Sequence, residues 1–266
     1  HYKGNRVFHK DFFLERRQEG RAQRQGKRSG QGSGMTVPVD PERFIAGGYL
    51  PASFLDWDGH VAAVVFTRGC NFRCPWCHNS ELVLGKSEKL DLVRITDDIR
   101  RRKKFLDGVV LTGGEPTLWS GLFDFIRKMK ELEISVKLDT NGSMPEILER
   151  LLEEDLASHV AMDVKSPIDR CSLKRVTGVD ADPEAISKSI ALIKRAAPSY
   201  EFRTTFIDGL LTIEDMKKIR NELDDDSHWV IQPFRPVGCL DPDFCSRPPA
   251  DPDRLKKEFP DIRVRG

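Results

Sequence analysis

The chain has 266 residues, of which 39% are hydrophobic, and its formal net charge is +1. No apolar stretch approaches the length that spans a bilayer, and no apolar leader opens the chain, so we expect neither a membrane segment nor secretion, and a cytoplasmic location. Outside a basic N-terminal stretch the chain is mildly acidic, which does not indicate nucleic-acid binding. The six cysteines fit metal ligation in a reducing compartment better than a disulfide framework.

The first 34 residues differ in charge from the remainder. They hold nine Lys or Arg against three Asp or Glu, and they are rich in Arg, Gln, Gly and Ser without a sustained period. This composition predicts a disordered basic tail, with a polyanion-binding arm as the alternative. Residues 35–60 follow as a lead-in segment that is punctuated by turn residues, which predicts irregular structure or a small hairpin.

From residue 61 onward, apolar strand patterns alternate with helical patterns. Ser120 is a candidate helix cap, Pro145 suits a first helical turn, and Thr212 with Asp215 resembles a capping box. The expected strands are 61–66, 108–112, 135–139, 159–164, 200–206 and 228–232. The expected helices are 96–105, 120–132, 145–154, 182–197 and 212–223.

Six strand and helix alternations predict an α/β fold with a parallel sheet. We expect a partial TIM-like (β/α)6 barrel over residues 61–238, with residues 239–266 as a C-terminal extension. A flat doubly wound sheet is the alternative. A polar cluster follows each predicted strand, and a barrel would bring all these strand ends to one mouth.

The stretch TRGCNFRCPWCHN carries three cysteines at CxxxCxxC spacing, Cys70, Cys74 and Cys77, directly after a predicted strand. A loop of this kind wraps around one metal centre. A 4Fe–4S cluster normally takes four thiolates, so three cysteines leave one iron open to a substrate or cofactor. The alternative is a structural zinc site that His78 completes as the fourth ligand.

The motifs that follow the cysteine loop are LTGGEPTL, DTNG and MDVK. Together with the loop, they resemble the radical S-adenosylmethionine superfamily, and within it the glycyl-radical-enzyme activating enzymes. The preceding GGYLPASFLDWDGHVAAVVF is most similar to the anaerobic ribonucleoside-triphosphate reductase activating proteins. The resemblance covers about residues 44–238 and is more specific for the superfamily than for the partner.

This resemblance implies that the three cysteines form the catalytic and metal-binding set for one 4Fe–4S cluster. The open iron would be chelated by S-adenosylmethionine, whose amino group would be held by Gly113, Gly114 and Glu115. From the residues alone, two glycines after a strand permit another group to approach the backbone closely. An ordinary turn is the alternative.

Four residues of the next two motifs are further candidates for cofactor binding. The resemblance implies that Asp139 and Thr140 lie beside the ribose and a monovalent cation, whereas a strand-ending turn is the alternative. Asp163 and Lys165 alternate along their strand, so both can face the barrel interior. They would line the site near the methionine portion and an incoming peptide, or form a salt bridge.

Arg203 and Arg235 are candidates for contacts with a cofactor carboxylate or a substrate backbone. At Arg235, formate-lyase activases carry a histidine. Trp76 would pack near the adenine or shield the cluster, unless it is a core tryptophan. The other cysteines, Cys171, Cys239 and Cys245, lack the compact spacing of a second cluster, so we expect free thiols or a chance zinc pair.

The implied reaction is one-electron cleavage of S-adenosylmethionine to methionine and a 5′-deoxyadenosyl radical, which removes a hydrogen atom from a glycine of a partner enzyme. Overall likeness favours anaerobic ribonucleotide reductase as that partner. A low-potential donor such as flavodoxin or ferredoxin would supply the electron. The alternatives are a radical enzyme that modifies a small molecule or a peptide and, from another class, a non-catalytic zinc-binding adaptor.

Overall fold

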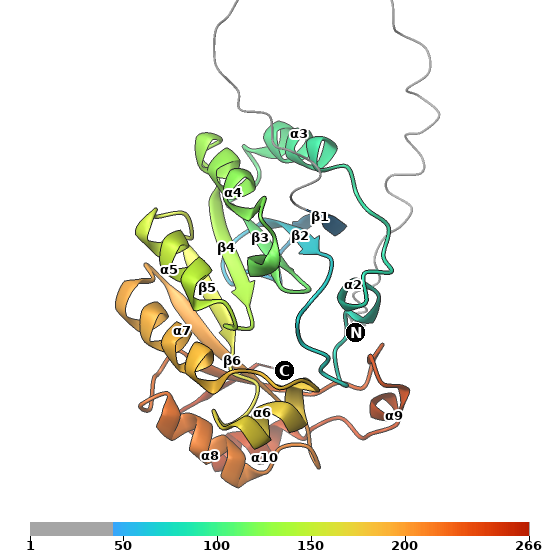
Figure 1. The fold of residues 1–266 in the computed structure, drawn as a ribbon, viewed down its shortest axis with the longest axis vertical. Coiled ribbons are helices and arrows are strands. Elements are labelled where there is room, and N and C mark those ends of the chain that lie inside the picture. The colour runs from blue at the N-terminus through green and yellow to red at the C-terminus, as the bar shows by residue number, and fades with distance from the viewer. Residues whose placement is uncertain (1–44, 266) are drawn as a thin grey trace, which may run out of the picture.

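The computed structural model describes residues 45–265 (Figure 1). The predicted basic tail and residues 35–44 of the lead-in lie outside the described residues. Within the described part, one eight-stranded sheet holds its strands in sequential order. The strands are β1 (Ala46–Ser53), β2 (Ala62–Thr67), β3 (Gly108–Gly113), β4 (Ser135–Thr140), β5 (His159–Asp163), β6 (Tyr200–Phe206), β7 (Trp229–Pro233) and β8 (Arg263–Val264).

The strand order confirms the predicted parallel α/β barrel and not the doubly wound alternative. All neighbours from β2 to β8 pair in parallel, and each strand lies beside the next one in the chain. A doubly wound sheet would instead reverse its order at a switch point. The six predicted strands correspond to β2 to β7. The lead-in adds β1, which forms an antiparallel hairpin with β2.

Helices connect the strands on the outside of the sheet. Figure 1 shows α4, α5, α7 and α8 following one another along this side. No helix among residues 45–265 has the length and apolar character needed to cross a membrane. The helices are α2 (Ser80–Val83), α3 (Leu92–Arg102), the 3₁₀ helix η3 (Pro116–Leu118), α4 (Leu122–Glu131), α5 (Pro145–Glu153), α6 (Arg170–Thr177), α7 (Pro183–Ala196), α8 (Ile213–Glu222), α9 (Pro242–Cys245) and α10 (Pro252–Glu258).

Two helix starts differ from the sequence prediction. The α3 helix begins at Leu92, because the Asp91 side chain accepts hydrogen bonds from the second and third helical amides. The expected cap Ser120 does not lie at the N-cap of α4; Gly121 does, without a side-chain capping bond. The predicted capping box of Thr212 and Asp215 is confirmed at α8.

The two faces of the sheet have different roles. In β2, Ala63 and Val65 belong to the main apolar cluster, whereas Ala62, Val64 and Phe66 belong to a second cluster around Trp57. Alternation along a strand places these two sets on opposite faces. The Trp57 ring lies so close to Gly108 that an added Cβ there would meet it at 2.5 Å. The first strands therefore fill the interior with apolar side chains.

The interior becomes charged from β4 onward. The Lys137 side chain is only 3% exposed and lies 3.4 Å from Glu201 of β6. Glu201 also pairs with Arg265, which follows β8, and Arg265 pairs with Asp58 before β2. These ion pairs join the last strand of the sheet to the turn between the first two. The parallel pairing of β7 with β8 places β8, which lies beyond residue 238, in the same sheet as the predicted barrel.

Candidate functional site

Polar residues from neighbouring strands meet at the carboxyl end of the sheet. The register pairs Thr67 with Gly113 at the ends of β2 and β3, and Asp163 with Arg203 in β5 and β6. The Thr140 hydroxyl at the end of β4 donates to a carboxylate oxygen of Glu115, 2.8 Å away. The structure thus brings the strand-end motifs together in one region, as a barrel mouth requires.

The cysteine loop leaves β2 and is held by main-chain contacts at both sides. The Gly69 amide donates to the Leu82 carbonyl of α2, and the Arg73 amide donates to the Thr177 carbonyl of α6, both at 2.7 Å. Cys74 lies on this loop and is buried, whereas Cys70 and Cys77 are partly exposed. The loop position is therefore set by the fold around it.

Burial is the main influence on the cysteine thiols. It raises the pKa of Cys70 to about 11 and that of Cys74 to about 12, and it raises the pKa of Cys77 as well; the nearby Lys165 cation opposes each rise. Thiols hold their protons under these conditions until a metal displaces them. Among residues 45–265, no three His, Cys, Asp or Glu side chains converge closely enough to hold one metal ion. Ligation by these cysteines stays a prediction.

The glycine turn after β3 packs directly on the cysteine loop. A Cβ on Gly114 would lie 1.8 Å from the Gly69 carbonyl oxygen, and Gly113 has a φ of +107°. The Glu115 amide donates to the same Gly69 oxygen over 2.9 Å. Only glycine permits this approach and this backbone conformation. The glycines therefore do permit a close backbone approach, and the segment that approaches them is the loop that carries the cysteines.

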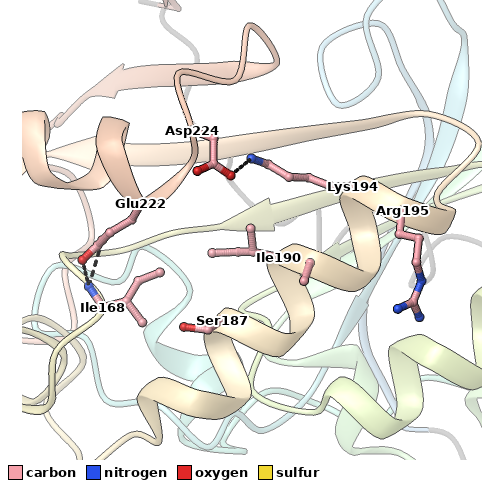
Figure 2. A pocket seen from close by; sticks show the side chains of 8 residues that line it. Ile168, Ser187, Ile190, Lys194, Arg195, Glu222 and Asp224 are labelled. Carbon is pink, nitrogen blue, oxygen red and sulfur yellow. Dashed lines mark hydrogen bonds and ion pairs between the residues drawn. The ribbon is translucent and has the colours of Figure 1, made fainter.

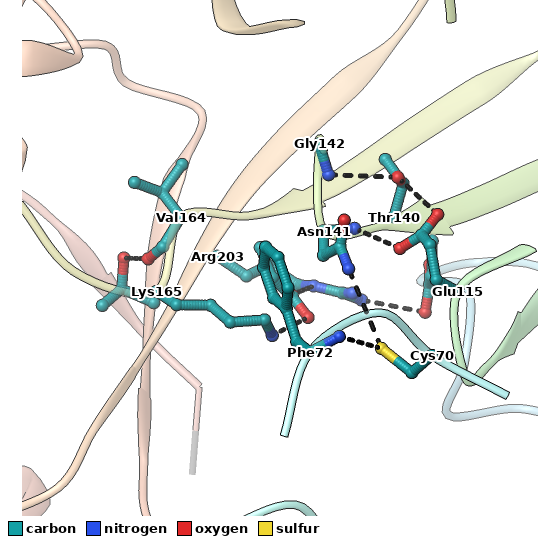
Figure 3. Close-up of polar contacts among 12 residues, drawn as sticks. Cys70, Phe72, Glu115, Thr140, Asn141, Gly142, Val164, Lys165 and Arg203 are labelled. Atoms are coloured by element: carbon teal, nitrogen blue, oxygen red, sulfur yellow. Dashed lines mark hydrogen bonds and ion pairs between the residues drawn. The ribbon is translucent and has the colours of Figure 1, made fainter. Parts of the chain in front are cut away.

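Glu115 is 1% exposed and joins the ends of β3 and β4 (Figure 3). Its carboxylate accepts hydrogen bonds from the hydroxyls of Thr117 and Thr140, at 2.6 and 2.8 Å, and from the Asn141 amide at 2.7 Å. Burial raises the pKa of this carboxyl, and the hydrogen bonds counteract that rise. A bound amino group would be an additional donor to a carboxylate that its own chain already positions.

A buried charge network crosses the mouth from β4 to β6. Arg203 donates to Asp163 at 2.8 Å and to Asp139 at 3.1 Å, and Lys165 donates to Asp163 at 3.1 Å. Although burial opposes ionisation, the two cations hold the pKa of Asp163 at about 2 and keep it ionised. The salt bridge considered for Asp163 and Lys165 is present, within a larger network.

Asp139 presents an acceptor that its own chain leaves without a hydrogen bond. Its Oδ1 atom is buried and has no hydrogen-bond partner among the described residues, and Lys137 Nζ lies 3.9 Å from it. Buried carboxylate oxygens normally have donors, so this atom fits a site for a hydroxyl or a cation of a bound cofactor. The cofactor-binding role of Asp139 stays a prediction.

Trp76 and Arg235 lie differently with respect to the charged residues. The Lys165 ammonium lies 5.1 Å from the centre of the Trp76 ring, and the Trp76 indole nitrogen is buried without a hydrogen-bond partner. Trp76 is thus beside the mouth. Arg235 is exposed, and it contacts the cysteine loop through its carbonyl oxygen, which accepts a hydrogen bond from His78 Nε2 at 2.8 Å. The roles of both residues stay predictions.

The His78 contact also bears on the zinc alternative. The ring stacks against Phe234 with 5.9 Å between centroids, and Nε2 is engaged by the Arg235 carbonyl. This places the side chain against the segment that follows β7. With Nε2 engaged in this way, a Cys₃His zinc site would have to use Nδ1 of the His78 ring as its ligand.

Sequence reasoning missed several polar residues of this region. Asn141 belongs to the DTNG motif, which we interpreted through its Asp and Thr, yet its amide contacts Asn71 of the cysteine loop. Lys137 and Glu201 lie inside the barrel. The alternation of Lys137 with Asp139 in SVKLDT is the signal that would have placed Lys137 on the interior face.

The three other cysteines lie in two places. Cys171 is exposed on α6, whereas Cys239 and Cys245 lie together, since the Cys239 amide is 3.2 Å from the Cys245 sulfur. These two cysteines are therefore the pair to which the expectation of a chance zinc pair applies. They are close because the short helix α9 turns the chain back between them. All three are free thiols.

A cavity of about 430 Å³ lies elsewhere, between α7 and α8 (Figure 2). Its charged side chains already have partners: Lys194 pairs with Asp224, and Glu222 accepts from the Ile168 amide. None of the predicted site residues lines it. We therefore place the candidate site at the strand ends.

Comparisons with known proteins identify the family. The model of the "Radical SAM superfamily" matches residues 64–223. A Methanocaldococcus jannaschii protein named "Putative glycyl-radical enzyme activating enzyme MJ1227" is 33% identical over 218 residues, which cover 80% of this chain and 89% of that protein. A "Probable GTP 3′,8-cyclase" from Sulfurisphaera tokodaii is 32% identical over 164 residues, but the match covers only 49% of the cyclase.

A solved structure shows the same fold. SuiB of Streptococcus suis, bound to its precursor peptide SuiA, superposes with a TM-score of 0.59 and 13% identity over 76% of this chain and 48% of that one. The predicted cofactors, one 4Fe–4S cluster and S-adenosylmethionine, are those of the matching family.

Proposed function

We propose that this chain, which belongs to the radical SAM superfamily, generates a glycyl radical on a partner enzyme, and that the partner is an anaerobic ribonucleoside-triphosphate reductase. It would do so by reductive cleavage of S-adenosylmethionine to a 5′-deoxyadenosyl radical. The observation that carries the glycyl-radical part of the proposal is the match to the M. jannaschii protein, which spans 89% of that protein. The choice of the reductase as partner rests on the likeness of residues 47–66 to the reductase activating proteins.

Three cysteines would hold the cluster in this proposal, namely Cys70, Cys74 and Cys77. When bound, the cluster and S-adenosylmethionine supply the one-electron chemistry, with the electron taken from a low-potential donor such as flavodoxin or ferredoxin. The close contact between Gly114 and Gly69 supports a cofactor position shared by the glycine turn and the cysteine loop. The protein contributes binding, orientation and exclusion of water.

The charged residues of the mouth would orient the cofactor. The unpartnered Oδ1 of Asp139 is an acceptor for a ribose hydroxyl or a cation, and Trp76 offers an apolar surface for the adenine. Lys165 lies near the cysteines and would partly offset the negative charge of three thiolates. Arg203 holds Asp139 and Asp163 in fixed positions. The proposed hydrogen-atom transfer does not require an acid–base pair.

The main alternative is a radical SAM enzyme that modifies a small molecule or a peptide. The match to the cyclases supports this alternative for the part of the chain that aligns with them, but this chain spans about half of their length. The SuiB likeness concerns the fold alone at 13% identity. Both alternatives would use the same cluster residues, so the product of the reaction must discriminate between them.

The experiment begins with protein that is reconstituted with iron and sulfide without oxygen, reduced, and mixed with S-adenosylmethionine. We expect 5′-deoxyadenosine and methionine to form, and we expect Cys74→Ala to abolish both. Addition of the reductase should then give a glycyl radical signal in electron paramagnetic resonance. Cleavage without any radical on the reductase would contradict the proposed partner, and absence of acid-labile sulfide would contradict the whole proposal.

A further inference from the structure

Asn141 connects the end of β4 to the first cysteine of the loop. Its Nδ2 atom lies 3.8 Å from the Cys70 sulfur, although the two residues are 71 positions apart in the sequence (Figure 3). The Asn141 residue is 4% exposed. Water therefore has little access to this amide, and a donor aimed at sulfur in such surroundings has few competing partners.

The orientation of the Asn141 amide is fixed by its other contacts. Its Oδ1 atom accepts from the Ser143 main-chain amide at 2.9 Å, and because that group can only donate, the opposite end of the side chain must be the NH₂ group. The Nδ2 atom donates to Asn71 Oδ1 at 2.9 Å, which leaves its second hydrogen for the Cys70 sulfur.

The main chain of Asn141 is fixed as well. Its amide donates to Glu115 Oε2 over 2.7 Å, and Glu115 is itself held by the glycine turn on the cysteine loop. The Asn71 side chain donates in turn to Ser143 Oγ at 2.7 Å, which closes a small ring of hydrogen bonds. A donor held in this way keeps its position when the charge on the sulfur changes.

We infer that Asn141 is a positioning residue whose amide donates a hydrogen bond to the Cys70 sulfur and thereby raises the reduction potential of the iron–sulfur cluster. The inference rests on the proposed function, because it requires Cys70 to be a cluster ligand. Hydrogen bonds to cluster sulfurs stabilise the reduced state, which carries the greater negative charge. The Phe72 amide, 3.3 Å from the same sulfur, adds a main-chain donor that substitution of Asn141 leaves in place.

The first test is a redox titration of the reconstituted cluster in Asn141→Ala, followed by electron paramagnetic resonance. We expect the equilibrium constant for one-electron reduction to fall about tenfold, which is about 59 mV to more negative potential. Ser143→Ala is the matched control: it removes the hydroxyl that Asn71 contacts but keeps the main-chain amide that orients Asn141. An equal shift in both variants would overturn the inference.

The second test does not depend on whether Asn141→Ala folds. In unsubstituted protein with ¹⁵N only in asparagine side chains, pulsed electron paramagnetic resonance of the reduced cluster should detect coupling to an amide nitrogen. Asn71→Ala should retain that coupling, because its own Nδ2 atom is directed at Ser143. Absence of coupling in a protein that still cleaves S-adenosylmethionine would overturn the role of Asn141 alone. Failure of the unsubstituted protein to assemble any cluster would overturn both this inference and the proposed function.

Discussion

Arg203 donates from Nε to Asp163 Oδ1 over 2.8 Å, and the two residues lie opposite each other on the paired strands β6 and β5. The same guanidinium reaches Asp139 on β4, so one cation joins three consecutive strands. Arg203 can serve both partners because its planar group presents several donors in fixed directions. This relationship links the stability of the barrel to the geometry of the mouth.

Replacement of Arg203 by methionine should destabilise the protein strongly. The change leaves two carboxylates in a low-dielectric site without their shared cation, and removal of one partner from a buried ion pair costs about 3–5 kcal/mol. Urea denaturation measures the free energy of unfolding. The control is Arg94→Gln, since Arg94 and Asp91 form an exposed pair that should contribute no more than about 1 kcal/mol. Similar losses in the two variants would contradict the role of the network.

Gly114→Ala should disrupt the packing of the glycine turn on the cysteine loop. The new Cβ would meet a carbonyl oxygen of the main chain at 1.8 Å, so one of the two segments must move. We expect the reconstituted variant to bind much less iron and sulfide per chain. Gly59→Ala is a suitable comparison, because no neighbouring atom lies within 4 Å of its added group, so the variant adds only the strain of a side chain at a φ of +75°. Full iron and sulfide content in Gly114→Ala would argue against a cofactor site that the glycine turn and the cysteine loop share.

His159 should make the stability of the protein depend on pH. Burial, reinforced by Lys137, lowers the pKa of His159 to about 4 from its usual 6.5. The unfolded chain therefore takes up a proton that the folded chain refuses, and stability falls as the pH decreases from about 6.5 to about 4. His159→Gln should flatten this part of the profile of unfolding free energy against pH. If the dependence of the unfolding free energy on pH were the same in the variant, groups other than His159 would be its cause.

Cysteine substitutions should separate the proposed cluster ligands from the other thiols. Cys74→Ala removes a buried thiol of the loop and should abolish 4Fe–4S assembly, whereas Cys171→Ala removes an exposed thiol on α6 and should leave iron and sulfide content unchanged. The measurement is iron and acid-labile sulfide per chain after anaerobic reconstitution. Equal loss in both variants would point to general damage instead of ligation.

The sequence predicts much of the fold because the local signals are strong. All six residues of β2 are buried, and such a continuous apolar run is easily recognised. The strand β8 has only two residues, Arg263–Val264, so no periodicity can develop within it. The α6 helix was missed although it has a cap at Asp169 and ends at Gly178 with a φ of +72°. Its polar composition obscured the apolar period.

The site was predictable only in part. Motif residues such as Gly114 and Asp139 follow predicted strands, and the barrel brings those strand ends together. The hydrogen bonds of Asn141 join segments far apart in the chain, and nothing local indicates which sulfur its amide will reach. The charge on the barrel interior, with Lys137 beside Glu201, depends on how two distant strands face each other. Such pairings follow from tertiary structure.

The most direct measurement of the central claim follows a hydrogen atom from the partner. The reductase is prepared with glycine that carries deuterium at the α-carbon and is mixed with the reduced, reconstituted protein and S-adenosylmethionine. Our account predicts a glycyl radical on the reductase and one deuterium atom in the 5′-deoxyadenosine. Unlabelled 5′-deoxyadenosine, with no radical on the reductase, would contradict it.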